Sequence, residues 1–254
     1  VKGVVVMAGE DSMPDTKLKN VYCYETLLAQ ESTDYPWPEL DENTACSLCY
    51  TSGTTGNPKG VLYSHRSLVL QSYACCLGDG MGLSAHDVAL PIVPMFHVNA
   101  WNMPYSAALA GFTLVFPGSK MGDGETFQRL IEEEGVKYAV GVPTVWLALL
   151  NYLKESGKSV SSLERVGVGG SACPLSIMHD FEKNHGVTTI TGWGMTEMAP
   201  LGTFNAPKHP RDYYSDEEYD KLRVRAGRPV FGVSMKIVDD VGQELPWDLS
   251  LIHI

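Results

Sequence analysis

Short apolar runs alternate with longer amphipathic segments along most of this chain, and this alternation restricts the fold more than any other feature. The runs are rich in Val, Ile, Leu and Tyr, as strands are, whereas the segments between them repeat with a helical period. Strands that alternate with helices form βαβ units, so we predict an α/β fold with a largely parallel sheet and helices on both faces. The expected strands are residues 88–93, 113–116, 138–142, 165–168 and 187–191, and the expected helices are 126–134, 144–154 and 174–185.

The composition excludes several classes of protein. The chain has 254 residues, 44% of them hydrophobic, which is enough for a sizeable core. A formal net charge of −11 leaves no basic face for a nucleic-acid backbone, so no nucleic-acid partner is expected. No apolar run approaches the ~20 residues of a transmembrane segment. The six cysteines are irregularly spaced without a zinc pattern, so we expect reduced thiols in a cytoplasmic protein.

The strongest chemical signal is the loop Tyr50–Gly60, which reads YTSGTTGNPKG and lies between two apolar runs. Glycines let backbone N–H groups turn toward an anion, Ser and Thr hydroxyls add donors, and Lys59 adds a positive charge. These features predict a polyphosphate site. The loop is not a Walker A motif, because Pro58 stands where that motif requires glycine.

This loop resembles the signature loop of the adenylate-forming superfamily, which includes acyl-CoA synthetases, beetle luciferases and the adenylation domains of peptide synthetases. In that family the loop closes over the β- and γ-phosphates of ATP. The resemblance implies that role for Thr51, Ser52, Gly53, Thr54, Thr55, Gly56 and the catalytic residue Lys59.

A second segment, Thr191–Glu197, follows the expected strand 187–191. Ligands of α/β sheets bind at the carboxyl ends of strands, and Glu197 could hold Mg²⁺ there beside a phosphate. Alone, the segment would be a tight turn with a solvated Glu; beside the first loop it indicates a nucleotide site. It resembles the adenine motif of the same family, with Trp193 in place of the usual Tyr. The resemblance implies that Gly192, Trp193 and Gly194 border the adenine, Thr196 contacts the α-phosphate, and Glu197 binds Mg²⁺.

The segment Gly167–Ala172 spells G-x-G-x-x-A between a predicted strand and helix, which matches the dinucleotide fingerprint. That fingerprint also needs an acidic residue at the end of the next strand, but this strand ends at Thr191 and Gly192. A nicotinamide site is therefore the weaker interpretation. In the resembled family this stretch lines the adenine and ribose, which implies nucleotide contacts for Gly170, Ser171 and Ala172.

The third segment, Val93–Trp101, leads into an expected apolar helix at 103–110. A lone His and a Trp in apolar surroundings are usually core residues. The segment resembles one that borders the carboxylate and gates the acyl tunnel in the fatty-acid branch of the family. This implies a catalytic position for His97 beside the acyl-adenylate and a gate role for Trp101. Val142 and Pro143 would form another wall of the pocket.

The resemblance extends from about Val4 to Asp248 and implies a carboxylic-acid:CoA ligase of the AMP-forming type, acting on fatty acids with ATP, Mg²⁺ and CoA. We expect residues 1–248 to be part of an N-terminal ATP- and acyl-binding domain, 249–254 to be an aberrant or truncated tail, and the family's C-terminal domain to be absent. The chain alone is then not expected to be fully active.

Two alternatives stay open: an adenylate-forming enzyme with another acceptor, and a non-catalytic nucleotide-binding module. The acid's chain length and whether the protein forms a homodimer are also open.

Overall fold

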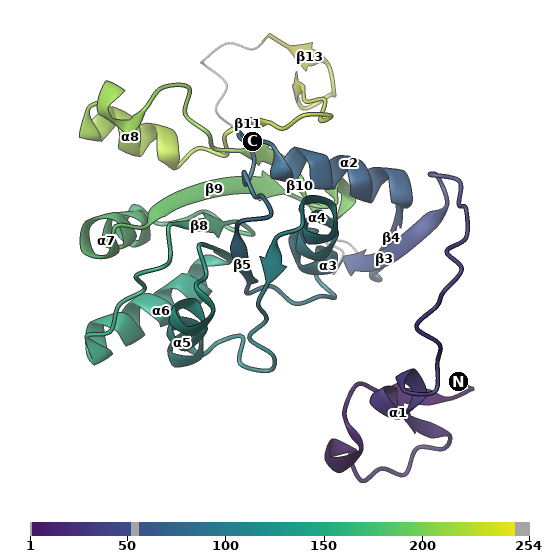
Figure 1. Ribbon diagram of the computed structural model, residues 1–254. Coiled ribbons are helices and arrows are strands. Elements are labelled where there is room, and N and C mark those ends of the chain that lie inside the picture. The colour runs from purple at the N-terminus through teal and green to yellow at the C-terminus, as the bar shows by residue number, and fades with distance from the viewer. Residues whose placement is uncertain (1, 52–55, 247–254) are drawn as a thin grey trace. The chain divides into compact units, whose positions relative to one another are not determined.

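The computed structural model of the chain describes residues 2–51 and 56–246, which divide into two compact units, Val1–Asp41 and Glu42–Ile254. The smaller unit is built on two short parallel strands. Its elements are β1 (Val4–Val6), the 3-10 helix η1 (Glu10–Ser12), β2 (Val21–Cys23) and α1 (Tyr24–Leu28) (Figure 1).

The larger unit is organised around a seven-stranded sheet with the order β11-β10-β9-β8-β7-β5-β6. The five strands from β9 to β6 are parallel to one another, and β10 and β11 are antiparallel additions at one edge. This arrangement confirms the predicted α/β fold with a largely parallel sheet. The strands are β5 (Val88–Pro91), β6 (Thr113–Leu114), β7 (Tyr138–Gly141), β8 (Arg165–Val168), β9 (Thr188–Gly194), β10 (Leu201–Phe204) and β11 (Arg228–Pro229).

Helices cover both faces of this sheet, as expected (Figure 1). On one face a core forms around Phe127, Trp146 and Phe181, which come from α5 (Gly124–Glu134), α6 (Pro143–Ser156) and α7 (Leu175–His185). On the other face Cys75 of α2 (His65–Cys76) and Met103 of α4 (Met103–Ala110) pack with strand residues. Buried apolar side chains on both faces explain why the strands read as continuous apolar runs. Among the described residues, no helix is both long and apolar enough to cross a bilayer.

Strand β9 continues further than the sequence indicates. The prediction ended at Thr191, whereas the strand extends to Gly194 because β10 pairs with this last part in antiparallel orientation. A Cβ atom on Gly194 would lie 1.9 Å from the carbonyl oxygen of Pro200, so only glycine allows β10 to approach so closely. The segment Thr191–Glu197 is therefore partly strand rather than a loop after a strand.

The remaining elements of the larger unit lie around the sheet. Strands β3 (Ala45–Thr51) and β4 (Lys59–Ser64) form an antiparallel hairpin, which confirms the prediction of one strand on each side of the Tyr50–Gly60 loop. The side chain of Ser64 accepts a hydrogen bond from the backbone of Ser67 and so caps α2. The other elements are η2 (Thr196–Met198), η3 (Arg211–Tyr213), β12 (Ile237–Val238) and β13 (Glu244–Leu245).

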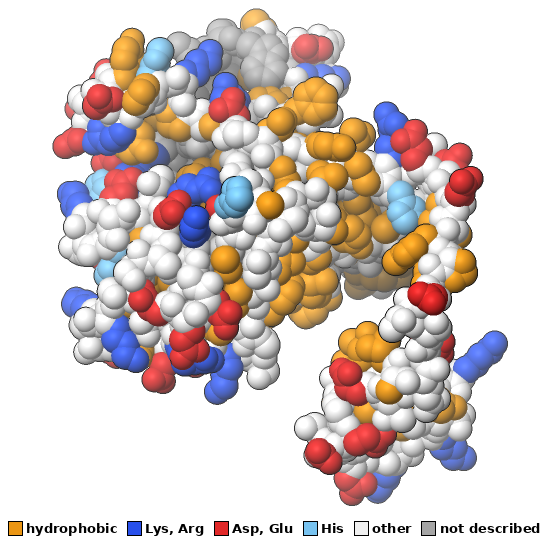
Figure 2. Space-filling view, in the orientation of Figure 1, with side chains coloured by type: hydrophobic (Ala, Val, Ile, Leu, Met, Phe, Trp, Pro, Cys, Tyr) orange, Lys and Arg blue, Asp and Glu red, His pale blue; other side chains and the backbone are white. Residues whose placement is uncertain are grey.

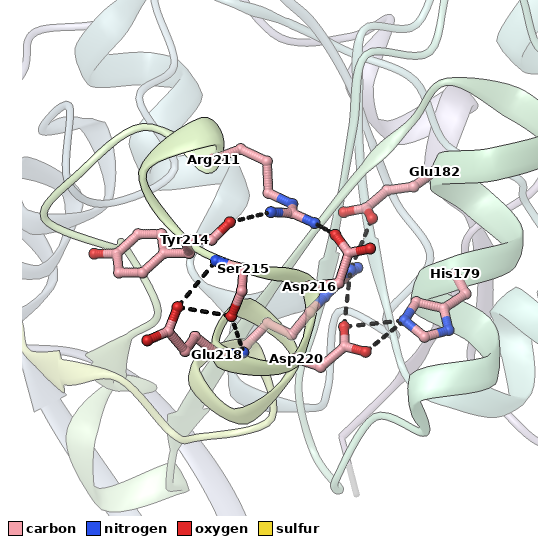
Figure 3. A network of polar contacts seen from close by, with 9 residues as sticks. His179, Glu182, Arg211, Tyr214, Ser215, Asp216, Glu218 and Asp220 are labelled. Carbon is pink, nitrogen blue, oxygen red and sulfur yellow. Dashed lines mark hydrogen bonds and ion pairs between the residues drawn. The ribbon is translucent and has the colours of Figure 1, made fainter.

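Helix α8 (Asp216–Arg223) is attached to α7 by charged side chains. Ser215 and Glu218 form a reciprocal capping box at its start (Figure 3). At its end the buried guanidinium of Arg223 lies 2.7 Å from Glu182, and Asp220 lies 2.9 Å from the ring of His179. These pairs hold α8 beside α7.

Apolar side chains gather on the surface over α2 and the β3–β4 hairpin (Figure 2). Leu48, Tyr50 and Leu62 of the hairpin are each at least half exposed, and Val69 and Tyr73 of α2 are about half exposed. Charged side chains are more frequent over α5, α6 and α7 in the same view. Exposed apolar patches of this kind are typical of contact surfaces.

Candidate active site

A cavity of about 230 Å³ lies beside the carboxyl ends of β7, β8 and β9 in the larger unit. Ligands of open α/β sheets bind at this edge, because the loops after neighbouring parallel strands converge there. The wall combines residues from three separate segments that the sequence had singled out. It includes His97, Trp101, Gly170, Gly192, Trp193, Gly194 and Thr196.

His97 and Trp101 are positioned by an unusual backbone turn. The segment α3 (Val98–Trp101) and the following Asn102 all have positive φ angles, from 50° to 63°, and therefore form a left-handed turn. Such a conformation costs roughly 1–2 kcal/mol for each non-glycine residue. The sequence does not indicate this turn, since β-branched Val98 rarely adopts a positive φ. The expected apolar helix, α4, begins directly after it.

Two asparagine side chains hold this turn in place. Asn99 is buried, and its side-chain oxygen accepts a hydrogen bond from the hydroxyl of Ser47 on β3 at 3.0 Å. Asn102 donates from its side-chain nitrogen to the hydroxyl of Ser72 on α2 at 2.9 Å. Asn tolerates the left-handed region better than most residues. The hairpin and α2 thus fix the strained turn from both sides, and His97 is left exposed at the cavity rim.

The indole of Trp101 stands against the glycines that follow β8. A Cβ on Gly169 would lie 3.1 Å from Cη2 of Trp101, and a Cβ on Gly170 would lie 3.1 Å from Cγ1 of Val142. Val142 therefore flanks the cavity without lining it. Pro143 is buried at the start of α6, and Ser171 and Ala172 are exposed in the loop before α7; none of these three lines the cavity wall.

The β3–β4 hairpin is attached to the segment Thr191–Glu197 by one short hydrogen bond. Tyr63 of β4 is buried, and its hydroxyl donates to the carbonyl oxygen of Thr196 at 2.5 Å. Thr51 and Lys59 pair at the end of the hairpin, and Gly56 and Lys59 are exposed to solvent. The structure thus brings Lys59's strand beside Thr196. Ser52, Gly53, Thr54 and Thr55 lie outside the described residues.

Glu197 lies next to Thr196 on η2 and is exposed. Burial raises the pKa of Tyr63 above its usual value, and the nearby side chains of Cys49 and Glu197 raise it further. In the described part of the chain, no cluster of His, Cys, Asp and Glu side chains forms a cage for a metal. Mg²⁺ beside phosphates is usually bound by one or two carboxylates, with phosphates and water as the other ligands. A single accessible carboxylate at this position fits that type of site.

The sequence analysis missed two residues at this site. Tyr138 begins β7 and forms part of the cavity wall, although its strand was interpreted only as core. Tyr63 was treated as part of an apolar strand, but it joins the hairpin to η2. A polar aromatic residue within an apolar strand was the only available signal. Their partners are more than 25 residues away or lie in the cavity, so no local pattern could identify them.

Comparisons with known proteins agree with this geometry. Residues 5–249 match the model of the family described as AMP-binding enzyme. The chain is 51% identical over 249 residues to a medium-chain-fatty-acid–CoA ligase of Ectopseudomonas oleovorans, covering 98% of this chain and 45% of that protein. It is 49% identical over 248 residues to a 3-methylmercaptopropionyl-CoA ligase of Ruegeria lacuscaerulensis, covering 98% and 46%. The chain thus spans about half the length of the curated relatives that it matches.

A solved structure shows the same fold. The long-chain-fatty-acid-CoA ligase of Archaeoglobus fulgidus superposes with a TM-score of 0.77 over 96% of this chain and 51% of its own, at 22% sequence identity. The family match, the close relatives and the shared fold all point to one assignment. The chain belongs to the AMP-binding enzyme family.

Proposed function

We propose that this chain supplies the ATP- and acyl-binding region of an AMP-forming carboxylic-acid:CoA ligase that acts on fatty acids. The observation that carries the proposal is the single cavity wall shared by Trp101 and by Trp193–Thr196. An acyl group beside Trp101 would then lie next to a nucleotide beside Trp193. The relatives named as medium-chain-fatty-acid and 3-methylmercaptopropionyl-CoA ligases support a carboxylic acid as the substrate and CoA as the acceptor.

The proposed reaction has two steps. A carboxylate oxygen attacks the α-phosphorus of ATP, the bond to pyrophosphate breaks, and an acyl-adenylate forms. The thiol of CoA then attacks the acyl carbon and releases AMP. In the first step the protein aligns the two reactants and stabilises the charge that develops on the phosphates.

We assign the phosphate contacts to two neighbouring segments. Lys59 and the loop Thr51–Gly56 would hold the β- and γ-phosphates, and Thr196 would contact the α-phosphate. Glu197 would be the protein ligand of Mg²⁺, which lowers the cost of the charge that accumulates on phosphate oxygens. The bond between Tyr63 and Thr196 supports this assignment because it holds the strand of Lys59 beside η2.

We assign the base and acyl contacts to the cavity. Gly192, Trp193 and Gly194 would border the adenine, with Gly170, Ser171 and Ala172 on the side of β8. His97 at the rim would lie by the acyl-adenylate, and Trp101 would gate the acyl path with Val142 and Pro143 behind it. Trp101 lies close to Gly169 and Val142 lies close to Gly170, which supports a narrow passage at this point.

The test uses a ligase of the relatives' full length that carries this sequence (the full-length ligase). It is incubated with ATP, Mg²⁺ and a panel of carboxylic acids, with CoA or with a phosphopantetheine carrier protein as the acceptor. The proposal predicts acyl-CoA and AMP as products, with a dependence on the acid. Formation of an acyl-carrier thioester without acyl-CoA would favour the alternative acceptor, and ATP binding without turnover of any acid would favour a non-catalytic nucleotide-binding module.

A further inference from the structure

One part of the cavity wall is apolar except for one phenol. Met81, Val140, Leu201 and Phe204 contribute to this wall together with Tyr138. All five side chains are buried. An apolar pocket with one polar group orients its ligand through that group.

The hydroxyl of Tyr138 makes no hydrogen bond within the described part of the chain, although the residue is fully buried. A Cβ on Gly167 would lie 2.4 Å from this oxygen, so the hydroxyl lies over the backbone of β8 in the space that a larger side chain at this position would fill. The guanidinium of Arg165 lies over the ring, 5.1 Å from its centroid, and donates instead to the carbonyl of Met81 at 2.7 Å. A buried hydroxyl without a partner costs roughly 1–3 kcal/mol. A ligand atom that accepted its proton would remove that cost.

The hydroxyl lies deeper in the sheet than the proposed gate. Gly167 and Gly169 are two residues apart on β8 and its extension, so they face the same side of the sheet. Trp101 lies over Gly169 and Tyr138 lies over Gly167. Two strand residues correspond to roughly 6.6 Å. The phenol is therefore one short step beyond the gate, within reach of an acyl chain that passes Trp101.

We propose that the Tyr138 hydroxyl donates a hydrogen bond to a neutral acceptor atom on the distal part of the acyl chain. The preferred substrate is then a carboxylic acid that carries an ether, hydroxyl, carbonyl or thioether group a few bonds from its carboxylate, rather than a plain alkanoic acid. This inference rests on the proposed function. Burial raises the pKa of Tyr138, so the phenol keeps its proton and acts as a donor. A second carboxylate in this part of the cavity would be a buried charge with only one hydroxyl as its donor, which disfavours dicarboxylic acids.

The test is a scan with isosteric acids in the full-length ligase. In each acid one methylene of a medium-length alkanoate is replaced by an ether oxygen, at a different position in each member of the series. We expect kcat/KM to peak at one position, about tenfold above the plain alkanoate, since a hydrogen bond to a buried donor is worth about that factor. In Tyr138→Phe the peak should disappear, so that kcat/KM no longer depends on the position of the ether oxygen. Tyr73→Phe, on the exposed surface of α2, is the matched control and should keep the peak.

Stability and pyrophosphate exchange separate the outcomes. Because the Tyr138 hydroxyl has no partner in the described chain, Tyr138→Phe should unfold at the same temperature as wild type or higher. A wild-type enzyme that exchanges pyrophosphate with alkanoates but shows no positional peak would overturn the inference and leave the proposed function intact. A peak that survives in Tyr138→Phe would also overturn it. Absence of exchange with every acid would contradict the proposed function itself.

Discussion

We predict that loss of the hydrogen bond between Tyr63 and Thr196 weakens ATP binding. Tyr63→Phe removes only the hydroxyl that donates to the Thr196 carbonyl at 2.5 Å, and it keeps the ring in its buried position. A typical hydrogen bond contributes about 1 kcal/mol, and an unpaired buried carbonyl adds to the loss. Thr196 is partly exposed, so water can replace some of the bond. We therefore expect a loss of about 1–2 kcal/mol in the attachment of the hairpin to η2.

Two measurements on the full-length ligase detect this loss. Amide hydrogen exchange in β3 and β4 should become roughly five to thirty times faster, because local opening becomes more favourable by that free energy. The KM for ATP should rise by a similar factor at most, whereas the KM for the acid should change little, since Tyr63 is not part of the cavity wall. Tyr73→Phe is the control, because Tyr73 is about half exposed on α2 and lies outside the cavity wall. Unchanged exchange in the hairpin, or equal effects on ATP and acid, would refute the reasoning.

Three further predictions test other parts of the site. Lys59→Ala and Glu197→Gln alter exposed side chains, so both variants should fold normally, but their adenylation rate should fall roughly a hundredfold or more. Pyrophosphate exchange at the wild-type rate under limiting Mg²⁺ would show that the roles assigned to these two residues are wrong. Trp101→Ala should change the KM for longer acids more than the KM for ATP. Equal changes in the two KM values would indicate that Trp101 only packs in the core and does not gate the acyl path. Burial raises the pKa of the Cys75 thiol to about 12, so at pH 8 an alkylating reagent should modify this thiol only after unfolding. Partly exposed Cys46 should react in the native protein. Prompt labelling of Cys75 in the native state would contradict the structure.

The repeated elements of this fold were predictable because they rest on local patterns. Strand β8 has the predicted limits, and α7 differs from its prediction by one residue, since apolar periodicity and flanking glycines mark both. The site was predictable only where a sequence motif marks it, as in Trp193–Glu197. The left-handed turn at Val98–Asn102 was not predictable, because non-glycine residues adopt this conformation only when surrounding contacts compensate its strain. Those contacts come from Ser47 and Ser72, which are distant in the sequence.

The extension of β9 and the role of Tyr138 illustrate the same limit. Nothing in the residues before Gly194 indicates that β10 will pair with them; the pairing depends on the close approach of Pro200. The hydroxyl of Tyr138 gains its significance from Gly167 on the neighbouring strand, which leaves space above the backbone. Both features result from contacts between strands, and a single sequence does not show which strands are neighbours.

We propose that this chain's cavity brings a carboxylate to the α-phosphate of ATP. Isotopic exchange between pyrophosphate and ATP, measured in the full-length ligase without CoA, tests it most directly because the exchange reports the first step alone. We predict that label enters ATP only when a suitable carboxylic acid is present, and that Glu197→Gln slows the exchange. Exchange that does not depend on any acid, or no exchange across a broad panel of acids while ATP still binds, would contradict it.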